Sequence, residues 1–407
     1  MTSVVIVGGG PAGLMAAEVL SSKGLQVDLY DAMPSVGRKF LLAGKGGLNL
    51  THSEPADQFA ARYGKSQSHI ETMLESFGAE QIREWAAGLG IDTFVGTSGR
   101  VFPKDMKAAP LLRAWLHRLR TTGVRFHMRH KWTGWNAADE LTFNVKDGLQ
   151  TTFSKGYSSV ILALGGASWK RLGSDGAWAE MLKTRGIDLA PLEPSNCGFD
   201  AFVPWSEHFK SRFAGQPLKT VAIKVGDSKW QRGEFVVTET GVEGSLIYAV
   251  SSQLRDDISS SGFAAFQLDL LPDFSEERVL REINHPRGSK SLSSHLKSRL
   301  GLDGVKMGLL YELLLKNQMQ DALQLASSCK ALPIRLGRTR PMDEAISTAG
   351  GVRFAAMTSG LMLKAIPNIF CAGEMLDWEA PTGGYLLTAC LASGKRAAEG
   401  VVAHLKS

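Results

Sequence analysis

Apolar runs bounded by glycine-rich turns mark both ends of the chain. Val4–Val7 is a short apolar run, and an alanine-rich segment of helical character follows a glycine cluster and extends to Lys23. Further runs at Val27–Tyr30 and Ser159–Leu164 have the length of strands, and the second ends at two glycines. Nearly continuous apolar runs of this kind are typical of strands buried on both faces of a parallel sheet. The pattern therefore predicts an α/β fold.

The first turn has the spacing of a dinucleotide-binding site. Gly8, Gly10 and Gly13 form G-x-G-x-x-G between the first strand and the helix, and Asp31 ends the second strand. In such a unit the first glycine permits the tight turn, the second lets a pyrophosphate approach, and the third lets the helix pack on the strand. The start of the helix favours phosphate charge, and Asp31 is placed to bond an adenosine ribose. Because all four features follow in register, we interpret the turn as a dinucleotide site rather than an ordinary strand-to-helix turn.

The middle of the chain has different patterns. Residues 55–121 have mostly helical spacing, and residues 124–161 look like short antiparallel strands with a turn at Lys146–Gly148. From Leu192 onward the chain becomes rich in β-formers, and it turns helical again at 274–328. These changes indicate separate structural parts between the two glycine-rich ends.

We therefore expect a fold that is built from both chain ends and carries two insertions. The predicted boundaries are 1–190 for the first part of the dinucleotide-binding domain, 191–273 for an inserted β-rich domain, 274–330 for an inserted helical domain, and 331–407 for the return through the β-rich domain to the second part of the first domain.

Composition excludes several classes of protein. The 407 residues are 44% hydrophobic, which is enough for several cores, and the formal net charge of +6 is mild for this length. Basic residues do not cluster with interleaved aromatics, so no nucleic-acid partner is expected. No apolar run is long enough to span a membrane, and the first strand begins too early to leave room for a signal peptide. We expect a cytoplasmic protein without membrane association, and nothing in the sequence indicates an oligomeric state.

The cysteines do not form a metal or redox motif. They are widely spaced and include no C-x-x-C pair, so we predict neither a metal site nor a dithiol centre. Buried free thiols in a reducing compartment account for them. The four residues are Cys197, Cys329, Cys371 and Cys390.

Two more segments have the composition of ligand-binding loops. Gly37–Asn49 is rich in glycine, which suits close approach of the backbone to a flat or phosphorylated ligand. Arg38 and Lys39 lie in this loop and are cationic partners for a pyrophosphate, although a plain solvated loop would also be polar. Near the end of the chain, the apolar run Ile369–Glu374 ends in glycine and an acid, and Gly383–Gly384 precedes a helix. That helix start suits a phosphate or a carbonyl oxygen.

Together these motifs resemble those of the two-dinucleotide-domain flavoproteins. The glycine turn with Asp31 matches their FAD fingerprint, and Leu162–Gly166 resembles their second motif. Ile369–Glu374 is similar to their third motif, in which an acid contacts the ribityl chain. That acid is usually aspartate, and Glu374 stands in its place here. The resemblance implies that Glu374 or Asp377 bonds ribityl hydroxyls.

A narrower resemblance covers nearly the whole chain. Five segments look like those of the BaiN/aminoacetone-oxidase-like bacterial NAD(P)/FAD-dependent oxidoreductases. They are Gly37–Lys39, Ala43–Asn49, Ser347–Val352, Ala372–Asp377 and Thr382–Tyr385. The resemblance implies a Rossmann-like FAD-binding domain of the glutathione-reductase type, with an inserted β-barrel-like domain and a helical domain.

The loop at Gly46–Asn49 departs from that family. Members commonly have Gly-Arg-Cys-Asn where this chain has Gly-Gly-Leu-Asn, so no role of that arginine or cysteine is carried over. The segment also resembles the Gly-Gly-Ile-Asn of fumarate reductase-type enzymes, which implies that the loop lies near the isoalloxazine ring. In those enzymes that link flavin covalently, a histidine lies six residues before the first glycine. Phe40 occupies that position here, so non-covalent FAD is expected.

The leading functional hypothesis is an FAD-dependent oxidoreductase that acts on a small organic substrate by hydride transfer. No second G-x-G-x-x-G follows a strand in mid-chain, so NAD(P)H would dock only transiently, unless oxygen accepts the electrons. The predicted FAD contacts are Gly8, Gly10, Pro11, Ala12, Gly13, Asp31, Ala32, Arg38, Lys39, Ala163, Gly165, Gly373, Glu374, Asp377, Gly383, Gly384, Tyr385 and Leu386. The catalytic candidates are Lys45, Asn49, His52 and Tyr385.

Several of these assignments have plain alternatives. His52 is an acid/base by type or an ordinary loop histidine. Arg338 and Arg340 could bind a substrate carboxylate or be surface charges. Two other functions stay open, namely a flavin-dependent tRNA-modifying enzyme and a non-enzymatic flavin-binding sensor. The weak basic patterning argues against the first, and the glycine-lined approach to the flavin argues against the second.

Overall fold

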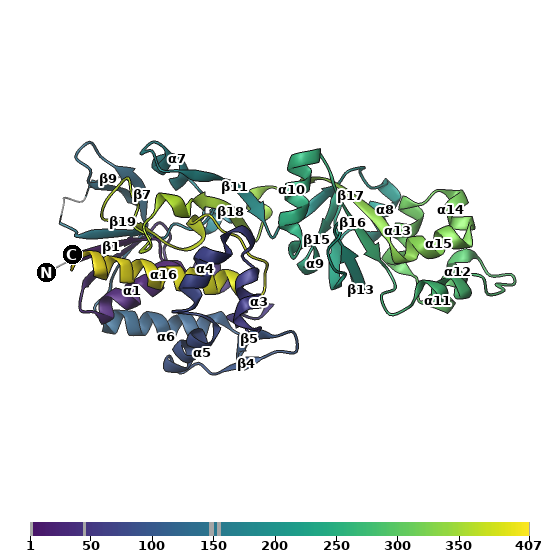
Figure 1. Ribbon diagram of the computed structural model, residues 1–407, viewed down its shortest axis with the longest axis horizontal. Coiled ribbons are helices and arrows are strands. Elements are labelled where there is room, and N and C mark those ends of the chain that lie inside the picture. Colours follow the sequence, from purple (N-terminus) through teal and green to yellow (C-terminus); the bar gives the residue numbers. More distant parts are fainter. Residues whose placement is uncertain (1–2, 44–45, 146–149, 153–155, 407) are drawn as a thin grey trace. The chain divides into compact units, whose positions relative to one another are not determined.

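The computed structural model describes residues 3–43, 46–145, 150–152 and 156–406. The chain forms two compact units (Figure 1). The terminal unit combines Met1–Glu193 with Ile346–Ser407, and the inserted unit is Pro194–Ala345. Each unit has its own cluster of buried apolar side chains.

A five-stranded parallel sheet forms the centre of the terminal unit. The order of its strands is β19-β10-β1-β2-β6, and every neighbouring pair is parallel. The strands are β1 Ser3–Val7, β2 Gln26–Asp31, β6 Arg125–Met128, β10 Ser159–Leu162 and β19 Ile369–Cys371. The strand order reverses at β1, so the turns that follow β1 and β10 leave the sheet at a topological switch point. This arrangement confirms the predicted α/β fold.

Helices from the two ends of the chain pack against each other in this unit. Helix α1 (Pro11–Ser22) follows the first strand, and α16 (Tyr385–His404) lies alongside it (Figure 1). A Cβ at Gly394 would lie 2.2 Å from the carbonyl oxygen of Ala12, so the two backbones touch at this point. The start and the end of the chain are therefore parts of one structural layer.

Shorter elements complete the terminal unit. The helices are α2 Arg38–Ala43, α3 Ala56–Ala61, α4 Gln67–Leu74, α5 Ala79–Gly88, α6 Ala108–Thr121 and α7 Trp178–Lys183. The small sheets are β3-β5-β4, β7-β8-β9 and β11-β18. Their strands are β3 Thr51–His52, β4 Thr93–Val95, β5 Arg100–Pro103, β7 His130–Trp135, β8 Leu141–Val145, β9 Gln150–Thr152, β11 Leu189–Ser195 and β18 Ser347–Val352. Single 3₁₀ turns lie at Gly64–Ser66, Lys170–Leu172, Phe354–Ala356 and Gly373–Met375.

The expectation of antiparallel strands throughout 124–161 is wrong for its first strand. Strand β6 pairs with β2 in the parallel sheet, because helix α6 carries the chain back across the sheet before β6 begins. The amphipathic pattern of α6 explains this placement, since Leu111, Trp115 and Leu119 are all buried on one face. Strands β7, β8 and β9 are antiparallel as expected, and the predicted turn at Lys146–Gly148 lies outside the described residues.

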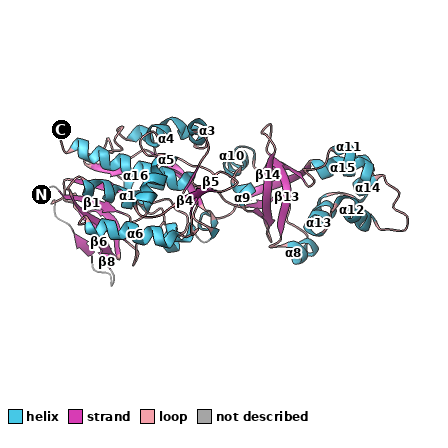
Figure 2. Ribbon diagram, turned by 90° about the horizontal axis from the view of Figure 1, so that it is seen from below, coloured by secondary structure: helices cyan, strands magenta, loops and turns pink. Residues whose placement is uncertain are grey.

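The inserted unit contains a closed barrel of six strands in the order β12-β15-β14-β13-β16-β17. Figure 2 shows β13 and β14 side by side in it. The strands are β12 Phe199–Ala201, β13 Pro217–Lys224, β14 Gln231–Val237, β15 Gly241–Glu243, β16 Ala264–Asp269 and β17 Leu332–Thr339. Strand β17 pairs with both β16 and β12, so it closes the barrel.

Helices of the inserted unit lie between the barrel strands in sequence. They are α8 Glu207–Phe213, α9 Ser245–Tyr248, α10 Ser251–Ser261, α11 Glu276–Ile283, α12 Leu292–Leu300, α13 Gly304–Leu313, α14 Lys316–Gln320 and α15 Ala322–Lys330. Side chains of Ser275, Ser291 and Asp321 cap α11, α12 and α15 by accepting backbone N–H bonds, which fixes where these helices begin. The barrel and this helical part match the predicted fold class, and a boundary between them stays a prediction.

Candidate functional site

The glycine turn after β1 has the geometry of a phosphate-binding turn. Gly8 has φ +109°, and a Cβ there would lie 2.1 Å from the carbonyl oxygen of Ala163, so only glycine fits beside β10. A Cβ at Gly13 would lie 1.9 Å from the carbonyl oxygen of Gly8, so α1 packs directly on the turn. Around Gly10, in contrast, a Cβ would meet nothing within 4 Å. The backbone at Gly10 therefore borders open space at the start of a helix.

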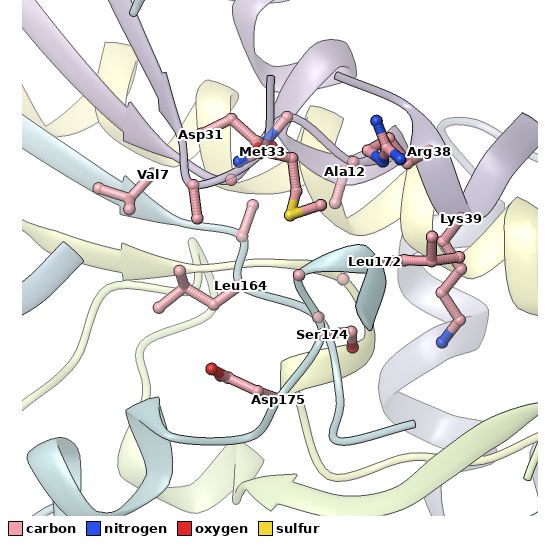
Figure 3. A pocket seen from close by; sticks show the side chains of 18 of the residues that line it. Val7, Ala12, Asp31, Met33, Arg38, Lys39, Leu164, Leu172, Ser174 and Asp175 are labelled. Carbon is pink, nitrogen blue, oxygen red and sulfur yellow. The ribbon is translucent and has the colours of Figure 1, made fainter. Parts of the chain in front are cut away.

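A cavity of about 330 Å³ opens at this turn. In Figure 3, Asp31 and Met33 lie on one side of it, Ser174 and Asp175 lie opposite, and Arg38 lies at one end. The predicted FAD contacts that line it are Gly8, Gly10, Pro11, Ala12, Asp31, Ala32, Arg38, Lys39, Ala163, Gly165, Gly373 and Glu374. All of them belong to the terminal unit, and they come from both ends of the chain.

Asp31 is tied to the turn by two backbone hydrogen bonds. Its carboxylate accepts one from the N–H of Gly9 and one from the N–H of Met33, both at 2.7 Å. Burial raises the pKa of Asp31, although these two bonds and the nearby Arg38 act in the opposite direction. A carboxylate has about four acceptor positions. Asp31 thus fixes the shape of the turn and keeps acceptor capacity for a ribose hydroxyl.

The two cations of the glycine-rich loop differ in their bonding. Lys39 donates to both carboxylate oxygens of Glu374, at 2.7 and 3.1 Å, and to the hydroxyl of Ser168. Glu374 also accepts the N–H of Thr348 at 3.0 Å, so this acid is held in place from two sides, in a partly buried pair. The Nε of Arg38 is buried and has no hydrogen-bond partner in the described part of the chain. Of the two cations, Arg38 is the one with an unsatisfied donor at the cavity.

The other predicted FAD contacts do not line this cavity. They are Gly13, Asp377, Gly383, Gly384, Tyr385 and Leu386. Gly384 has φ +105°, and a Cβ there would lie 2.5 Å from the backbone of Thr51, so the start of α16 packs against β3. Asp377 faces Arg353, with 3.7 Å between the charged atoms. Apart from Gly13, which packs on the glycine turn itself, these residues form a neighbouring part of the terminal unit.

Two catalytic candidates belong to one packed cluster. The rings of His52 and Tyr385 stack, with 5.3 Å between centroids. The Nδ1 of His52 accepts the N–H of Glu54 at 3.2 Å, and its Nε2 lies 3.0 Å from the carbonyl oxygen of Ser98. With Nδ1 accepting and Nε2–H donating, both ring nitrogens are in use.

Tyr385 is also engaged. Only 4% of the residue is exposed, burial raises the pKa of its hydroxyl, and a hydrogen bond to Glu54 acts in the same direction. Glu54 in turn forms a bidentate pair with Arg62, at 2.7 and 3.0 Å. Of the remaining catalytic candidates, Lys45 lies outside the described residues, and Asn49 has a buried Oδ1 without a partner among them.

Arg338 and Arg340 lie in the inserted unit and share one carboxylate. Asp200 accepts the Nε of Arg338 at 2.5 Å and the Nη1 of Arg340 at 3.1 Å. Arg340 also pairs with Glu344 at 2.8 Å. The two positive charges are therefore balanced by two negative ones, which does not favour the predicted binding of a substrate carboxylate.

Sequence reasoning missed one wall of the cavity. Residues of β7 and of the loop before α7 line it, namely His130, Lys131, Trp132, Ser174 and Asp175. Lys131 and Asp175 form an ion pair at 2.7 Å between these two segments. No motif reports this wall, because it arises only when β7 folds next to the end of β2. Gly173 and Gly176, which flank Ser174 and Asp175, are the sequence feature that could have indicated a ligand-binding loop here.

The fold and the cavity define the class of protein. A glycine turn between a strand and a helix, placed where the strand order reverses, is the characteristic feature of a dinucleotide-binding domain. The open approach at Gly10 and the unsatisfied Arg38 donor fit the phosphates of such a ligand. The chain belongs to the HI0933-like family, since the family model described as "HI0933-like protein Rossmann domain" matches residues 2–400. This match confirms the resemblance to the BaiN-like flavoproteins.

Curated relatives align over almost their whole lengths. A 3-dehydro-bile acid delta(4,6)-reductase of Clostridium scindens is 25% identical over 414 residues, which covers 97% of both chains. A ribosomal RNA dihydrouridine synthase of Escherichia coli is 25% identical over 389 residues, which covers 94% of this chain and 93% of its own. A protein of the same name from Haemophilus influenzae is 22% identical and covers 94% of both chains.

Solved structures share the fold. A 3-ketosteroid delta1-dehydrogenase from Sterolibacterium denitrificans superposes with a TM-score of 0.55 at 14% identity, covering 99% of this chain and 100% of its own. A flavocytochrome c3 fumarate reductase gives a TM-score of 0.50 at 16% identity, covering 100% and 79%. Together with the family match, these findings identify an FAD-dependent oxidoreductase. In the described part of the chain, no helix has the length and apolar character needed to cross a membrane.

Proposed function

We propose that this enzyme reduces a carbon–carbon double bond conjugated to a carbonyl group. One relative is named for reduction at positions 4 and 6 of a 3-dehydro bile acid, and two are named for making dihydrouridine in ribosomal RNA. The substrates differ greatly in size. In each of them, however, the double bond that is saturated is conjugated to a carbonyl. This shared chemistry, in relatives that align along nearly the whole chain, is the observation that carries the proposal.

Saturation of such a bond needs a hydride at the β-carbon and a proton at the α-carbon. Bound FAD supplies the hydride chemistry, and the protein supplies binding, orientation and the proton. Charge develops on the carbonyl oxygen as the hydride is added, so N–H or cationic donors near that oxygen lower the barrier. The task of the chain is to hold the conjugated system flat against the flavin and to exclude water.

The described residues support a division of this task. Arg38 and the start of α1 would hold the pyrophosphate, and Asp31 the ribose of the adenosine. The Lys39–Glu374 pair keeps a fixed polar group beside the cavity, where ribityl hydroxyls would reach it. Asn49, in the loop that resembles a flavin-facing segment, has an amide oxygen without a partner among the described residues. We assign it an orienting role.

His52 and Tyr385 fit positioning roles better than proton transfer. Both nitrogens of His52 have backbone partners, and the hydroxyl of Tyr385 lies in a buried network with Glu54. A proton donor must instead present a free acidic hydrogen to the substrate. Lys45 keeps its place as a candidate for that role, although it lies outside the described residues.

A small enone and a uridine in RNA are the two substrate classes that the relatives support. We favour the small molecule, because the formal charge of +6 is mild and the reductase of Clostridium scindens covers the most of this chain among these relatives. The second candidate, uridine reduction in ribosomal RNA, rests on the two dihydrouridine synthases. It would require salt-sensitive RNA binding.

Anaerobic turnover separates these possibilities. The purified yellow protein is reduced with NADH, NADPH or dithionite and mixed with a 4,6-dien-3-one bile acid or with a ribosomal RNA transcript. Reoxidation of the flavin with uptake of one hydride and one proton per double bond, measured by mass spectrometry, supports the proposal for that substrate. A reduced flavin that neither substrate reoxidises contradicts it. The Gly10→Val variant, designed to lack FAD, is the control for non-enzymatic reduction.

A further inference from the structure

The wall of the FAD cavity that carries no sequence motif contains unsatisfied polar groups. Trp132 is 4% exposed and Ser174 is 7% exposed, and both line the cavity. The Nε1 of Trp132 and the Oγ of Ser174 have no hydrogen-bond partner in the described part of the chain. A buried polar atom without a partner carries a free-energy cost, so its presence at a cavity indicates a ligand that satisfies it.

A third group on this wall has a defined hydrogen-bonding state. The Nδ1 of His130 lies 2.9 Å from the carbonyl oxygen of Met128, so this nitrogen carries the proton and donates it. In the neutral ring, Nε2 is then an acceptor. The ring is also packed edge-on against Tyr30, with 5.6 Å between centroids, and against Phe143, at 6.3 Å. His130 therefore presents an acceptor in a fixed orientation.

These groups lie beside the segment expected to bind the adenosine ribose. The N–H of Arg129, at the turn before β7, donates to the carbonyl oxygen of Met33 at 3.1 Å. Met33 in turn donates its N–H to Asp31. Figure 3 shows Ser174 across the cavity from Asp31 and Met33. A base attached to a ribose at Asp31 is thus within the reach of this wall.

We propose that His130, Trp132 and Ser174 read the adenine base of FAD. Trp132 provides only a donor, His130 provides an acceptor through Nε2, and Ser174 provides either. Adenine has an amino donor next to a ring-nitrogen acceptor, which complements a donor and an acceptor on the protein. Hypoxanthine has a carbonyl in place of the amino group and does not complement them. The inference rests on FAD as the cofactor and does not depend on which substrate is reduced.

The ion pair between Lys131 and Asp175 holds the two sides of this wall together. Lys131 is adjacent to Trp132 on β7, and Asp175 is adjacent to Ser174. Burial alone would raise the pKa of Asp175, but hydrogen bonds from Lys131 and from the N–H of Ala177 outweigh it and leave the pKa lowered. Asp175 is therefore ionised at neutral pH, and the pair links the strand that carries His130 and Trp132 to the loop that carries Ser174.

Titration of the deflavinated protein tests this proposal. FAD, flavin hypoxanthine dinucleotide and FMN are each added to the apoprotein, and binding is followed by quenching of flavin fluorescence. We expect the wild type to bind FAD about tenfold more tightly than the hypoxanthine analogue. Trp132→Phe and Ser174→Ala should each weaken FAD about five- to tenfold and reduce that preference. FMN lacks the adenylate, so its affinity should be the same in all three proteins.

Each other outcome decides against the proposal or against its premise. Equal affinity of the wild type for both dinucleotides overturns base reading, as does an equal loss of FAD and FMN in the variants. NADH is included as a competitor, and displacement of FAD by NADH would assign the adenine site to the nicotinamide cofactor instead. A protein that takes up no flavin at all removes the FAD assignment and the proposed function together, whereas unselective FAD binding removes only this inference.

Discussion

Two arginine sites of the chain have opposite bonding states. In the terminal unit, Arg38 lies at a cavity with a buried Nε that has no partner among the described residues. In the inserted unit, Arg338 and Arg340 share Asp200, and Arg340 also pairs with Glu344. Both sites are plausible anion sites from residue type alone. The structure separates them, because Arg38 has a buried donor without a partner among the described residues, whereas Arg338 and Arg340 are both paired with a carboxylate.

The comparison shows how a binding site differs from a structural charge cluster. The charges at Asp200 are satisfied within the inserted unit, where they link β12, β17 and the Thr240 hydroxyl. At the cavity, the polar atoms of Arg38, Trp132 and Ser174 are buried without partners. Unsatisfied buried groups are costly and are kept where a ligand completes them. Four predictions test this difference, in order of decreasing effect.

The largest effect is expected from Gly10→Val. The added side chain fills the open space at the start of α1 without striking protein atoms, because a Cβ there meets nothing within 4 Å. FAD affinity should fall about a hundredfold or more, which is about 3 kcal/mol, while the apoprotein keeps its melting temperature. Flavin content after purification and calorimetry of the apoprotein check this. Retention of tight FAD binding would show that the cofactor does not approach at Gly10.

The second prediction contrasts matched arginine substitutions. Arg38→Met should weaken FAD about tenfold to a hundredfold, because a charge-assisted hydrogen bond to phosphate contributes about 1.5–3 kcal/mol. Arg338→Met is the control and should leave FAD affinity unchanged. Fluorescence titration measures both. Equal effects of the two substitutions would contradict the distinction between the sites.

The third prediction concerns Asp200→Asn, which should affect stability and not cofactor binding. Burial pushes the pKa of Asp200 upward, but hydrogen bonds from Thr240, Arg338 and Arg340 outweigh it and hold the pKa below the ordinary 3.8. The folded carboxylate thus keeps its charge to a lower pH than the unfolded one. We expect a loss of about 1–3 kcal/mol at neutral pH, measured by urea unfolding.

The sign of the pH dependence follows from that lowered pKa. The stabilisation by Asp200 is complete above the unfolded value of 3.8 and is lost as the pH falls through the lower folded value. The difference between wild type and Asp200→Asn should therefore shrink at pH values below 3.8. A difference that grows on acidification would rule out this explanation.

The smallest effect is expected from Lys131→Met at the mouth of the cavity. Its side chain is 53% exposed, so the pair with Asp175 is largely screened by solvent. An exposed pair of this kind contributes about 1 kcal/mol or less, and FAD should dissociate up to about fivefold faster. Stopped-flow displacement of FAD measures this rate. An unchanged dissociation rate would show that the Lys131–Asp175 pair does not help to position the residues that line the cavity.

Much of the fold follows from local pattern. The apolar runs that became β1, β2, β10 and β19, and the spacing of Gly8 to Gly13, depend on periodicity and on sterics that the sequence shows directly. The mistaken pairing of β6 has a physical reason, since a short strand does not reveal its neighbour. Its direction was decided by the crossover helix α6 and not by its own residues.

The site was predictable only where a motif encodes backbone geometry. Gly8, Gly10 and Asp31 could be assigned because glycine and an acid have fixed tasks in that turn. His130, Trp132 and Ser174 could not be, because their unsatisfied atoms appear only after distant segments pack. Pairing partners are hidden in the same way. Neither the Lys39–Glu374 pair nor the charge balance at Asp200 can be read from residue types.

The union of the two chain ends has a consequence for synthesis. The barrel of the inserted unit has all its strands once Thr339 has left the ribosome, whereas the parallel sheet still lacks β19. Helix α1 then has no α16 to cover it, although α1 precedes the whole inserted unit in the chain. Domains generally fold as units, in the order in which they are completed. In this chain the inserted unit can therefore fold first, and the apolar surface of α1 beside the cofactor turn stays uncovered until α16 has been added.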